Sequence, residues 1–480
     1  RRIIDAVGEA AGAPHRPAPP APAGAATVRQ PGGVGDPVAR LDGDAKVTGR
    51  EAFGDDVAPA DALVLRVVRS PHPRAAFRLG DLGGYIAARP GLHLVLTARD
   101  IPGRNCFGVI PAFADQPVFA EAEARFRGEA VAAVIGEADA MAGLDLADFP
   151  VTWTPLPHAA TPDEAIGGEV DDLHPGRPRN VMCRGFVACG DAAGALAAAD
   201  VVVEGRFDTG FVEHAYIEPE AGFARMVGGR VEVHACTQAP VMDREALEAI
   251  LDLPAEAVRI VPTAVGGGFG SKLDISVQPF VALAAMRTGR AVRITYSRSE
   301  SMQSTTKRHP SEIVLRIGAG RDGTISGFAF HGRFNTGAYA SWGPTVANRV
   351  PVHASGPYRV ADYRAEAEGI HTHCPPAGAF RGFGVPQAAI AQEVLFDELA
   401  ERLGMDPLEF RLVNALDDGV PTVCGQVFAK GVGIRACLEA LRPAWERARA
   451  EVAAFNAAAQ AAGGVSRRGG GIAAGWYGCG

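Results

Sequence analysis

The pattern of apolar and polar positions divides the first part of the chain into short elements of mixed type. Residues 63–69 and 92–96 are rich in Leu and Val and bounded by polar turns, which predicts two strands. Residues 129–136 form a third apolar run of strand length, and an alanine-rich helical pattern follows at 138–147. We therefore expect residues 37–157 to form a compact α+β domain.

A longer region of the same mixed character occupies residues 158–480. One predicted helix ends at Gly404, and the next begins with Asp406 as its N-cap and Pro407 at its first position. The strands predicted here are residues 201–207, 230–236, 258–261, 291–297 and 311–317. The helices predicted here are residues 242–251, 277–286, 386–403 and 434–462. The whole chain is therefore expected to be of the α+β class.

Proline-rich segments separate these regions. Residues 14–36 are rich in Pro, Ala and Gly with almost no large apolar side chain, which is typical of a semi-extended linker. A second such segment, 161–178, follows the first domain. Residues 1–13 carry a short helical pattern that we interpret as the last helix of another domain. Because the chain starts without Met and stops in a strand-like run, we expect it to be a fragment of a longer protein.

Composition and charge exclude several classes of function. A chain of 480 residues with 47% hydrophobic and 21% charged residues is typical of a multidomain globular protein. Its net charge of −8 argues against a nucleic-acid partner, which needs clustered Lys and Arg. The sequence contains no apolar run of 18 residues, residues 1–14 lack the hydrophobic region expected of a signal peptide, and the eight cysteines form no Cys-x-x-Cys pair. We therefore expect a cytoplasmic protein with reduced thiols and no membrane segment.

The glycine-rich stretch 264–274 is the strongest candidate for a binding loop. It follows one predicted strand and precedes a predicted helix, so its backbone N–H groups can close on a bulky anionic ligand. It does not match the Walker pattern, because Ser271 stands where that pattern needs glycine. The Gly-x-Gly-x-x-Gly match at 318–323 lies between two alternating runs and predicts a hairpin turn, not a dinucleotide site. A tight turn without a ligand is the alternative interpretation of 264–274.

Two further segments complete a more specific pattern. Residues 379–387 read Ala-Phe-Arg-Gly-Phe-Gly-Val-Pro-Gln, again just before a predicted helix, and residues 212–220 read Val-Glu-His-Ala-Tyr-Ile-Glu-Pro-Glu. In this order, with 264–274 between them, they resemble the large molybdenum subunit of the xanthine dehydrogenase/aldehyde oxidase family. The resemblance implies an α/β hammerhead domain at 37–157, followed by the first half of a molybdopterin-binding domain of mixed sheets and helices at 158–480.

The resemblance also implies a chemistry. It implies a molybdenum-dependent oxidoreductase that hydroxylates an aromatic N-heterocycle, with water as the oxygen source, hydride transfer to Mo=S and electrons leaving through 2Fe–2S clusters. The implied cofactor is molybdopterin, often the cytosine dinucleotide form in bacterial members, and no side chain would bind the metal directly. Residues 1–13 would be the C-terminal helix of a fused 2Fe–2S domain. The implied partners are a small-molecule substrate and an FAD subunit or other electron acceptor, in an oligomer.

The resemblance assigns cofactor contacts to two groups of residues. The first group is the glycine loop itself, and the second surrounds an arginine whose backbone amide would meet the molybdenum centre. These positions are Gly267, Gly268, Phe269, Gly270, Arg381 and Gly382.

Three positions are implied to contact the substrate. Phe383 matches an aromatic side chain that stacks on a flat ring, and Arg349 matches a substrate-orienting arginine of purine hydroxylases. Leu273 stands where xanthine-hydroxylating members carry a glutamate, and Val212 replaces a glutamine found in many relatives. We therefore expect an aromatic N-heterocycle, such as one with a carboxylate, and not xanthine. Without the resemblance, Phe383 would be interpreted as a core residue and Arg349 as a surface residue.

Several alternatives stay open. Glu213, His214, Glu218 and Glu220 are interpreted mainly as structural, because the resemblance puts the catalytic glutamate beyond residue 480. No catalytic residue is expected in this fragment, and the fragment alone is expected to be inactive. An aldehyde-oxidising member of the family is the alternative enzyme, whereas a carbon monoxide dehydrogenase type is disfavoured because no cysteine interrupts the Arg381 segment. An inactive cofactor-binding or assembly subunit is the alternative from another class.

Overall fold

The computed structural model describes residues 36–478, which fall into two units that are considered separately. Among the described residues of the first unit, 36–51, one short helix forms, α2 (Gly43–Val47). The helix predicted within 1–13 and nearly all of the linker predicted at 14–36 lie outside the described residues. The second unit begins at Ala52 and contains all the other helices and strands of the described residues.

A seven-stranded mixed sheet organises one side of this unit. Its strand order is β11-β10-β9-β12-β1-β5-β3. Its members are β1 (Leu63–Arg69), β3 (Leu92–Leu96), β5 (Ala130–Gly136), β9 (Ala221–Val227), β10 (Arg230–Ala235), β11 (Val258–Pro262) and β12 (Val292–Thr295). At its centre β1 pairs in parallel with β12, so strands from both sides of the predicted domain boundary at residue 157 share one sheet.

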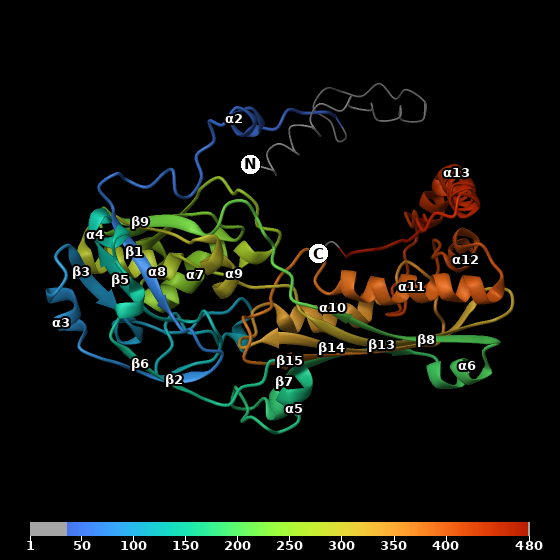
Figure 1. Ribbon diagram of the computed structural model, residues 1–480, viewed down its shortest axis with the longest axis horizontal. Coiled ribbons are helices and arrows are strands. Elements are labelled where there is room, and N and C mark those ends of the chain that lie inside the picture. Colours follow the sequence, from blue (N-terminus) through green and yellow to red (C-terminus); the bar gives the residue numbers. More distant parts are fainter. Residues whose placement is uncertain (1–35, 479–480) are drawn as a thin grey trace. The chain divides into compact units, whose positions relative to one another are not determined.

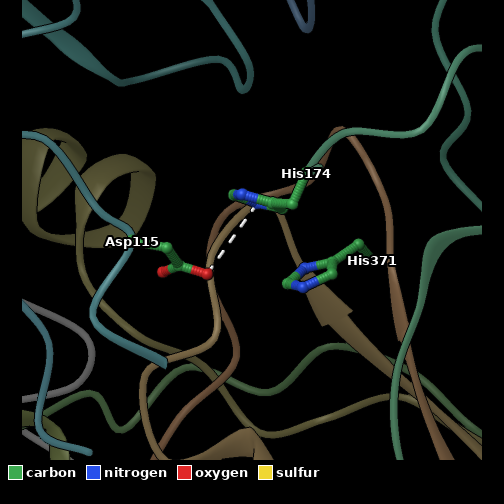
Figure 2. Close-up of side chains that lie close together, drawn as sticks. All are labelled: Asp115, His174 and His371. Atoms are coloured by element: carbon green, nitrogen blue, oxygen red, sulfur yellow. Dashed lines mark ion pairs between the residues drawn. The ribbon is translucent and has the colours of Figure 1, made fainter. Parts of the chain in front are cut away.

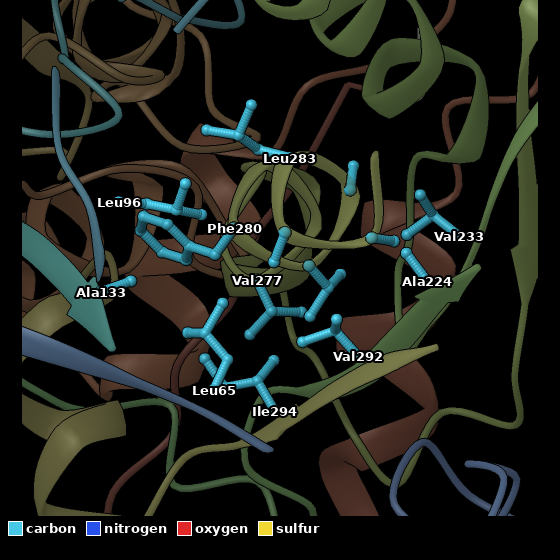
Figure 3. Close-up of a cluster of buried hydrophobic side chains, with 14 of the residues drawn as sticks. Leu65, Leu96, Ala133, Ala224, Val233, Val277, Phe280, Leu283, Val292 and Ile294 are labelled. Carbon is cyan, nitrogen blue, oxygen red and sulfur yellow. The ribbon is translucent and has the colours of Figure 1, made fainter. Parts of the chain in front are cut away.

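The core of this sheet is built from strands that are far apart in sequence. Helix α8 (Gln278–Thr288) packs on the sheet, and Phe280 and Leu283 lie above Leu65 and Ile294 of the strands (Figure 3). Helix α7 (Pro240–Leu251) packs beside α8. Because eight successive residues of α8 are buried, this helix is apolar all round, as expected for a helix inside a large core.

The second unit also contains a five-stranded sheet, whose strand order is β7-β15-β14-β13-β8. Helices α10 (Gly343–His353) and α11 (Val385–Leu403) lie on one face, and α5 (Pro162–Ile166) and α6 (Ala192–Ala198) lie on the other (Figure 1). The strands are β7 (Val181–Cys189), β8 (Val201–Thr209), β13 (Ser311–Ala319), β14 (Ile325–Gly337) and β15 (Tyr363–His371).

Smaller elements complete the unit. A three-stranded sheet contains β4 (Glu123–Ala124), β2 (Ala75–Leu79) and β6 (Val151–Pro155), and the helices α3 (Leu82–Ala87) and α4 (Ala138–Ala142) belong to the same region of the chain. The remaining helices are α9 (Arg298–Ser304), α12 (Pro407–Asn414) and α13 (Ile434–Ala461). None of the helices in the described residues is long and apolar enough to cross a membrane.

The α+β class and most predicted elements are confirmed. The strands predicted at 63–69 and 92–96 coincide with β1 and β3, and the 318–323 glycines lie in the hairpin between β13 and β14, as predicted. The helix predicted at 138–147 was too long, because α4 ends at Ala142 before Gly143 and a short 3-10 turn follows.

Two of the elements that the sequence did not predict, β15 and α10, have misleading local signals. Strand β15 contains Ala and Glu in alternation, which is not typical of a strand, but it pairs with β14 and β7 on both sides. Helix α10 contains Pro351 and begins at Gly343, which disfavour a helix locally. In both cases tertiary packing determines the conformation.

Helix α10 rests directly on the backbone of β7. A Cβ atom at Gly185 of β7 would lie 2.9 Å from the backbone carbon of Ala347 in α10 and would collide with its carbonyl oxygen. On the other side, a Cβ at Gly384 would meet Val346 of α10 at 3.0 Å. These glycines therefore allow α10, which carries Arg349, to pack closely against both the sheet and the start of α11.

We predict that Gly185→Ala destabilises the protein by about 1–3 kcal/mol, because the added methyl group must push α10 away from β7. Gly143→Ala is the matched control, since nothing lies within 4 Å of the methyl group that it adds. The measurement is the apparent urea unfolding midpoint of both variants. Equal midpoints for the two would contradict the close-packing explanation.

Candidate functional site

Two loops from distant parts of the chain meet backbone to backbone. The first loop (residues 264–270) follows β11, and the second loop (residues 379–384) precedes α11. The Arg381 N–H donates a hydrogen bond to the Phe269 carbonyl at 2.9 Å. A Cβ atom at Gly270 would lie 2.5 Å from the Ala379 carbonyl oxygen, and Gly270 has a φ of +120°. Glycine is therefore required at 270 both for conformation and for the contact between the loops.

The meeting point presents unpaired backbone donors. Among the described residues, no acceptor takes the N–H groups of Gly267, Gly268, Phe269 or Gly382. Helix α11 starts immediately after the second loop, with Gly384 as its N-cap, so the positive end of its dipole is at the same place. This combination of free amides and a helix N-terminus favours an anionic group.

Polar side chains hold the first loop from behind. The carboxylate of Glu218 accepts hydrogen bonds from the N–H groups of Gly266 at 2.7 Å and Gly54 at 2.9 Å. The Gln238 amide oxygen accepts from the Gly270 N–H at 3.0 Å, and its Cδ would lie 2.7 Å from a Cβ at Gly268. Side chains at Gly266 and Gly268 would therefore collide with Glu218 and Gln238. These two glycines are needed for the packing of the first loop as well as for the approach of a ligand.

A buried ion pair anchors the first loop to the support segment (residues 212–220). Lys272 Nζ lies 3.0 Å from the Glu218 carboxylate and also donates to the Glu218 carbonyl at 2.9 Å, and the Lys272 side chain is 1% exposed. Its ammonium group also lies 4.7 Å from the centre of the Tyr216 ring. Because two buried charges stabilise one another here, loss of either would leave the other without its partner.

The other acidic and basic groups of the support segment also have protein partners. The Glu213 carboxylate lies 2.6 Å from Lys307 Nζ, His214 Nε2–H donates to the Ala379 carbonyl at 2.8 Å, and the Tyr216 hydroxyl donates to Glu220. Burial lowers the pKa of His214 to about 4, so its imidazole is neutral at pH 7. These contacts agree with the structural role predicted for Glu213, His214, Glu218 and Glu220.

Arg349 and Phe383 are brought together, with aromatic neighbours that the sequence did not reveal. The Arg349 guanidinium lies 5.5 Å from the centre of the Phe383 ring and 4.8 Å from that of Tyr477. Trp342 contacts Phe383 edge to face at 5.9 Å. A groove of about 480 Å³ opens beside them, lined by Ile110, Pro344, Thr345, Asn348, Arg349, Val352 and His353. Tyr477 was missed because an aromatic residue near the end of a chain has no local signal for function.

The remaining predicted positions have different surroundings. Leu273 is half-buried in a 3-10 turn (Ser271–Leu273) directly after the first loop, and it is not among the residues that line the groove. Val212 is 49% exposed and forms a bridge with Arg308. The amide of Arg381 is already engaged by Phe269, so its contact with a cofactor stays a prediction, and the neighbouring Gly382 amide is the free donor.

Each of the two loops and the support segment contains a residue in a strained backbone conformation, and Ser341 before α10 has one as well. Phe269 and Phe383 have φ values of +52° and +44°, and Ala215 and Ser341 have +52° and +43°. Left-handed φ values are unfavourable for residues with a side chain and persist only where the surroundings impose them. Such outliers in both loops are typical of a functional site.

A cluster with the composition of a metal site lies elsewhere, and it is filled by an arginine. One ligand atom from each of Asp115, His174 and His371 lies within 4.8 Å of the others (Figure 2). However, Arg177 Nη1 lies 2.5 Å from Asp115 Oδ2 and 2.7 Å from His371 Nε2. His174 Nε2–H donates to the Ala338 carbonyl at 2.7 Å.

The protonation states of this cluster follow from its contacts. His371 Nδ1–H donates to the Gly337 carbonyl at 2.9 Å, which leaves Nε2 as the acceptor for Arg177. Burial lowers the pKa of His371 well below its usual value, and also lowers that of His174. Arg177 therefore occupies the position that a cation would take, and the cluster joins three distant segments of the chain.

Comparisons with known proteins give a consistent result. A model of the molybdopterin cofactor-binding domain matches residues 173–415, and a model of the aldehyde oxidase and xanthine dehydrogenase a/b hammerhead domain matches residues 48–157. The chain is 36% identical to the nicotinate dehydrogenase large molybdopterin subunit of Eubacterium barkeri, over 84% of this chain and 94% of that protein. It is also 36% identical to a probable xanthine dehydrogenase subunit of Bacillus subtilis, over 78% of this chain and 50% of that protein.

A solved structure is similar as well. The aldehyde oxidoreductase from Desulfovibrio gigas superposes with a TM-score of 0.81 and 30% sequence identity, covering 86% of this chain and 46% of that one. The chain thus spans most of the Eubacterium subunit but about half the length of the other two relatives.

We predict that Lys272→Met destabilises the protein by about 3–5 kcal/mol, because the largely buried Glu218 carboxylate would lose its cationic partner. Lys430→Met is the matched control, since Lys430 is exposed. The apparent unfolding midpoints in urea measure the difference. A change of less than about 0.5 kcal/mol relative to the control would contradict the role of the pair.

We predict that Arg177→Ala costs about 2–4 kcal/mol of stability, because Asp115 and His371 lose their partner. Removal of the guanidinium also opens a three-ligand set of the kind that binds Zn²⁺, so added zinc should raise the melting temperature of this variant and not of the wild type. Arg179→Ala, at an exposed arginine two residues away, is the control. Equal stabilisation of the wild type by zinc would show that Arg177 does not block the site.

Proposed function

Since the chain belongs to the molybdenum-binding subunits of the xanthine dehydrogenase/aldehyde oxidase family, we propose that it forms part of an oxidative hydroxylase acting on an aromatic N-heterocycle with a carboxylate. The observation that carries the substrate class is the Arg349 guanidinium beside the rings of Phe383 and Tyr477. A planar anionic substrate would find both a stacking surface and a charged donor there.

The residues at the two loops fit a molybdenum cofactor that brings its own metal ligands. The free N–H groups of Gly267, Gly268, Phe269 and Gly382 and the N-terminus of α11 suit the anionic oxygen and sulfur atoms of such a group. No group of His, Cys or acidic side chains with metal-binding geometry occurs at these loops in the described residues. When bound, the cofactor supplies the two-electron oxidation and the oxygen-transfer chemistry.

The chain's own residues would bind and orient the substrate. The five N–H donors of Arg349 can hold a carboxylate in a bidentate manner, and Arg349 projects from α10 to lie beside the rings of Phe383 and Tyr477. Leu273 has no hydrogen-bonding group, so the contact that the resemblance assigns to a glutamate in xanthine-hydroxylating members would be absent for a purine, at a cost of about 1–3 kcal/mol. This supports an N-heterocycle other than xanthine.

Aldehyde oxidation is the second candidate, favoured by the similarity to the Desulfovibrio aldehyde oxidoreductase. A small neutral aldehyde does not need a guanidinium for recognition, so the presence of Arg349 between two aromatic rings favours the charged heterocycle. The name of the Eubacterium relative, a nicotinate dehydrogenase subunit, supports the same choice.

The catalytic base, the form of the cofactor and the electron acceptors complete the proposal. We propose that the catalytic base comes from outside residues 1–480, that the cofactor is in the cytosine dinucleotide form, and that electrons pass to 2Fe–2S clusters and to an FAD subunit or other acceptor. We also propose that the site residues act together as the family pattern implies, with Arg381 and Gly382 on the cofactor side. An inactive binding or assembly subunit is the remaining alternative.

The test is to produce the complete enzyme in a molybdenum-competent host, to measure metal and released nucleotide, and to assay pyridine-3-carboxylate, pyridine and an aromatic aldehyde. We expect molybdenum near one per chain and the highest kcat/KM with the carboxylate. Absence of molybdenum would favour the binding or assembly subunit, and a preference for the aldehyde would favour the second candidate.

We predict that Arg349→Met raises KM for pyridine-3-carboxylate by about 30–100-fold, the loss expected for a charged hydrogen-bonded contact. The turnover of pyridine, which has no carboxylate, should change less than about threefold and serves as the internal control. Equal losses with both substrates would mean that Arg349 does not recognise the carboxylate.

A further inference from the structure

The Arg308 side chain donates hydrogen bonds to two carbonyl groups of the second loop. Arg308 Nη2 donates to the Arg381 carbonyl at 2.9 Å, and Nη1 donates to the Phe380 carbonyl at 3.3 Å. His214 holds the preceding carbonyl, that of Ala379, at 2.8 Å. Three successive carbonyl groups of the second loop are therefore held by two side chains.

The direction of the carbonyls determines the direction of the amides. In a trans peptide the C=O of one residue and the N–H of the next point in opposite directions, and the described chain has no cis peptide bond. The Phe380 N–H consequently points away from His214, and the N–H groups of Arg381 and Gly382 point away from Arg308. The hydrogen bond from the Arg381 N–H to the Phe269 carbonyl confirms this direction for the middle one.

Arg308 and His214 also contact the second loop through the aromatic ring of Phe380. The Arg308 guanidinium carbon lies 3.9 Å from the ring centre, and His214 stacks on the ring at 4.1 Å with an interplanar angle of 22°. Arginine is suited to this position because its planar group can stack on a ring and donate two directed hydrogen bonds at the same time. Lysine can replace its charge but not this geometry.

The backbone around Arg308 is itself held by the other segments of the site. The Arg308 N–H donates to the Val212 carbonyl at 3.0 Å, and the neighbouring Lys307 pairs with Glu213. The Lys307 carbonyl accepts from the Gly378 N–H at 3.0 Å, just before the second loop. Arg308 is thus fixed between the support segment and the second loop.

The charge of Arg308 is not neutralised by any carboxylate of the described residues within ion-pair distance. Its partners are carbonyl oxygens and an aromatic ring, and burial lowers its pKa to about 10, so it stays charged at pH 7. A half-buried cation with neutral partners beside a set of free amides adds to the attraction of the site for an anion.

We propose that Arg308 is a positioning residue for the anionic cofactor: by holding the Phe380 and Arg381 carbonyls it directs the Arg381 amide to the first loop and leaves the Gly382 amide free for the anion, and it supplies a positive charge behind them. This inference rests on the proposed function for the nature of the anion, whereas the positioning of the loop does not depend on it. Two kinds of measurement therefore test it.

The first experiment measures loop order in the metal-free complete protein. Hydrogen exchange of peptides covering residues 376–384 should be at least about tenfold faster in Arg308→Gln than in the wild type, because two carbonyl contacts are lost. Arg316→Gln is the control, since Arg316 is half-exposed on β13 and pairs with Glu204 at 3.0 Å. If these peptides exchange at the same rate in Arg308→Gln as in Arg316→Gln, the positioning role is overturned, whether or not the protein binds molybdenum.

The second experiment measures molybdenum retained after dialysis of the holoenzyme, together with kcat and KM. We expect Arg308→Gln to retain about one tenth of the wild-type metal or less. Arg308→Lys should retain most of it and lose about tenfold in kcat with KM unchanged, because charge is kept and geometry is lost. If Arg308→Gln does not fold, Arg308→Lys is the variant that tests the inference. A metal content and a kcat of Arg308→Lys that are both within twofold of those of Arg316→Gln would overturn it. A wild-type enzyme without molybdenum would instead overturn the proposed function.

Discussion

The close contact between the first and the second loop is the constraint on which the rest of the site depends. It is made by backbone atoms, from the Arg381 N–H to the Phe269 carbonyl and from Gly270 to Ala379. Backbone atoms can approach this closely only where no side chain stands between them, so Gly270 cannot be replaced without separating the loops. Because the amides are oriented by this contact, the proposed binding of an anion depends on the assembled pair and not on either loop.

The supports of this contact are charged or strongly polar and come from other parts of the chain. Glu218 and Lys272 hold the first loop, and Arg308 and His214 hold the second. Buried polar groups are stabilising only when their partners are in place, so this network makes the site rigid and sensitive to single substitutions. The strained conformations of Phe269 and Phe383 are maintained by the same packing.

The two sheets position the two loops and the groove beside Arg349 at the same time. The seven-stranded sheet leads through β11 into the first loop, and β15 of the five-stranded sheet leads into the second. Helix α10 lies on the five-stranded sheet through Gly185, which sets the place of Arg349 relative to Phe383. The pairing of β1 with β12 ties the early strands to this framework, so the early and late parts of the unit share one core.

The sequence by itself determined the features that depend on local conformation. Asp406 caps α12 with Pro407 at its first position, and the glycines at 318–323 form a hairpin, because side-chain capping and φ preferences act within a few residues. The order of the glycine loops also identified the family before any contact was known.

Tertiary structure alone decided the conformations of β15 and α10, whose local signals contradict them, since pairing and packing outweigh propensity. It also decided that Arg177 fills the Asp115–His174–His371 cluster, that Tyr477 lies beside Arg349, and that Arg308 orients the second loop. Those contacts join residues far apart in the chain, and a side chain's spacing in sequence carries no information about which distant carbonyl or ring it meets.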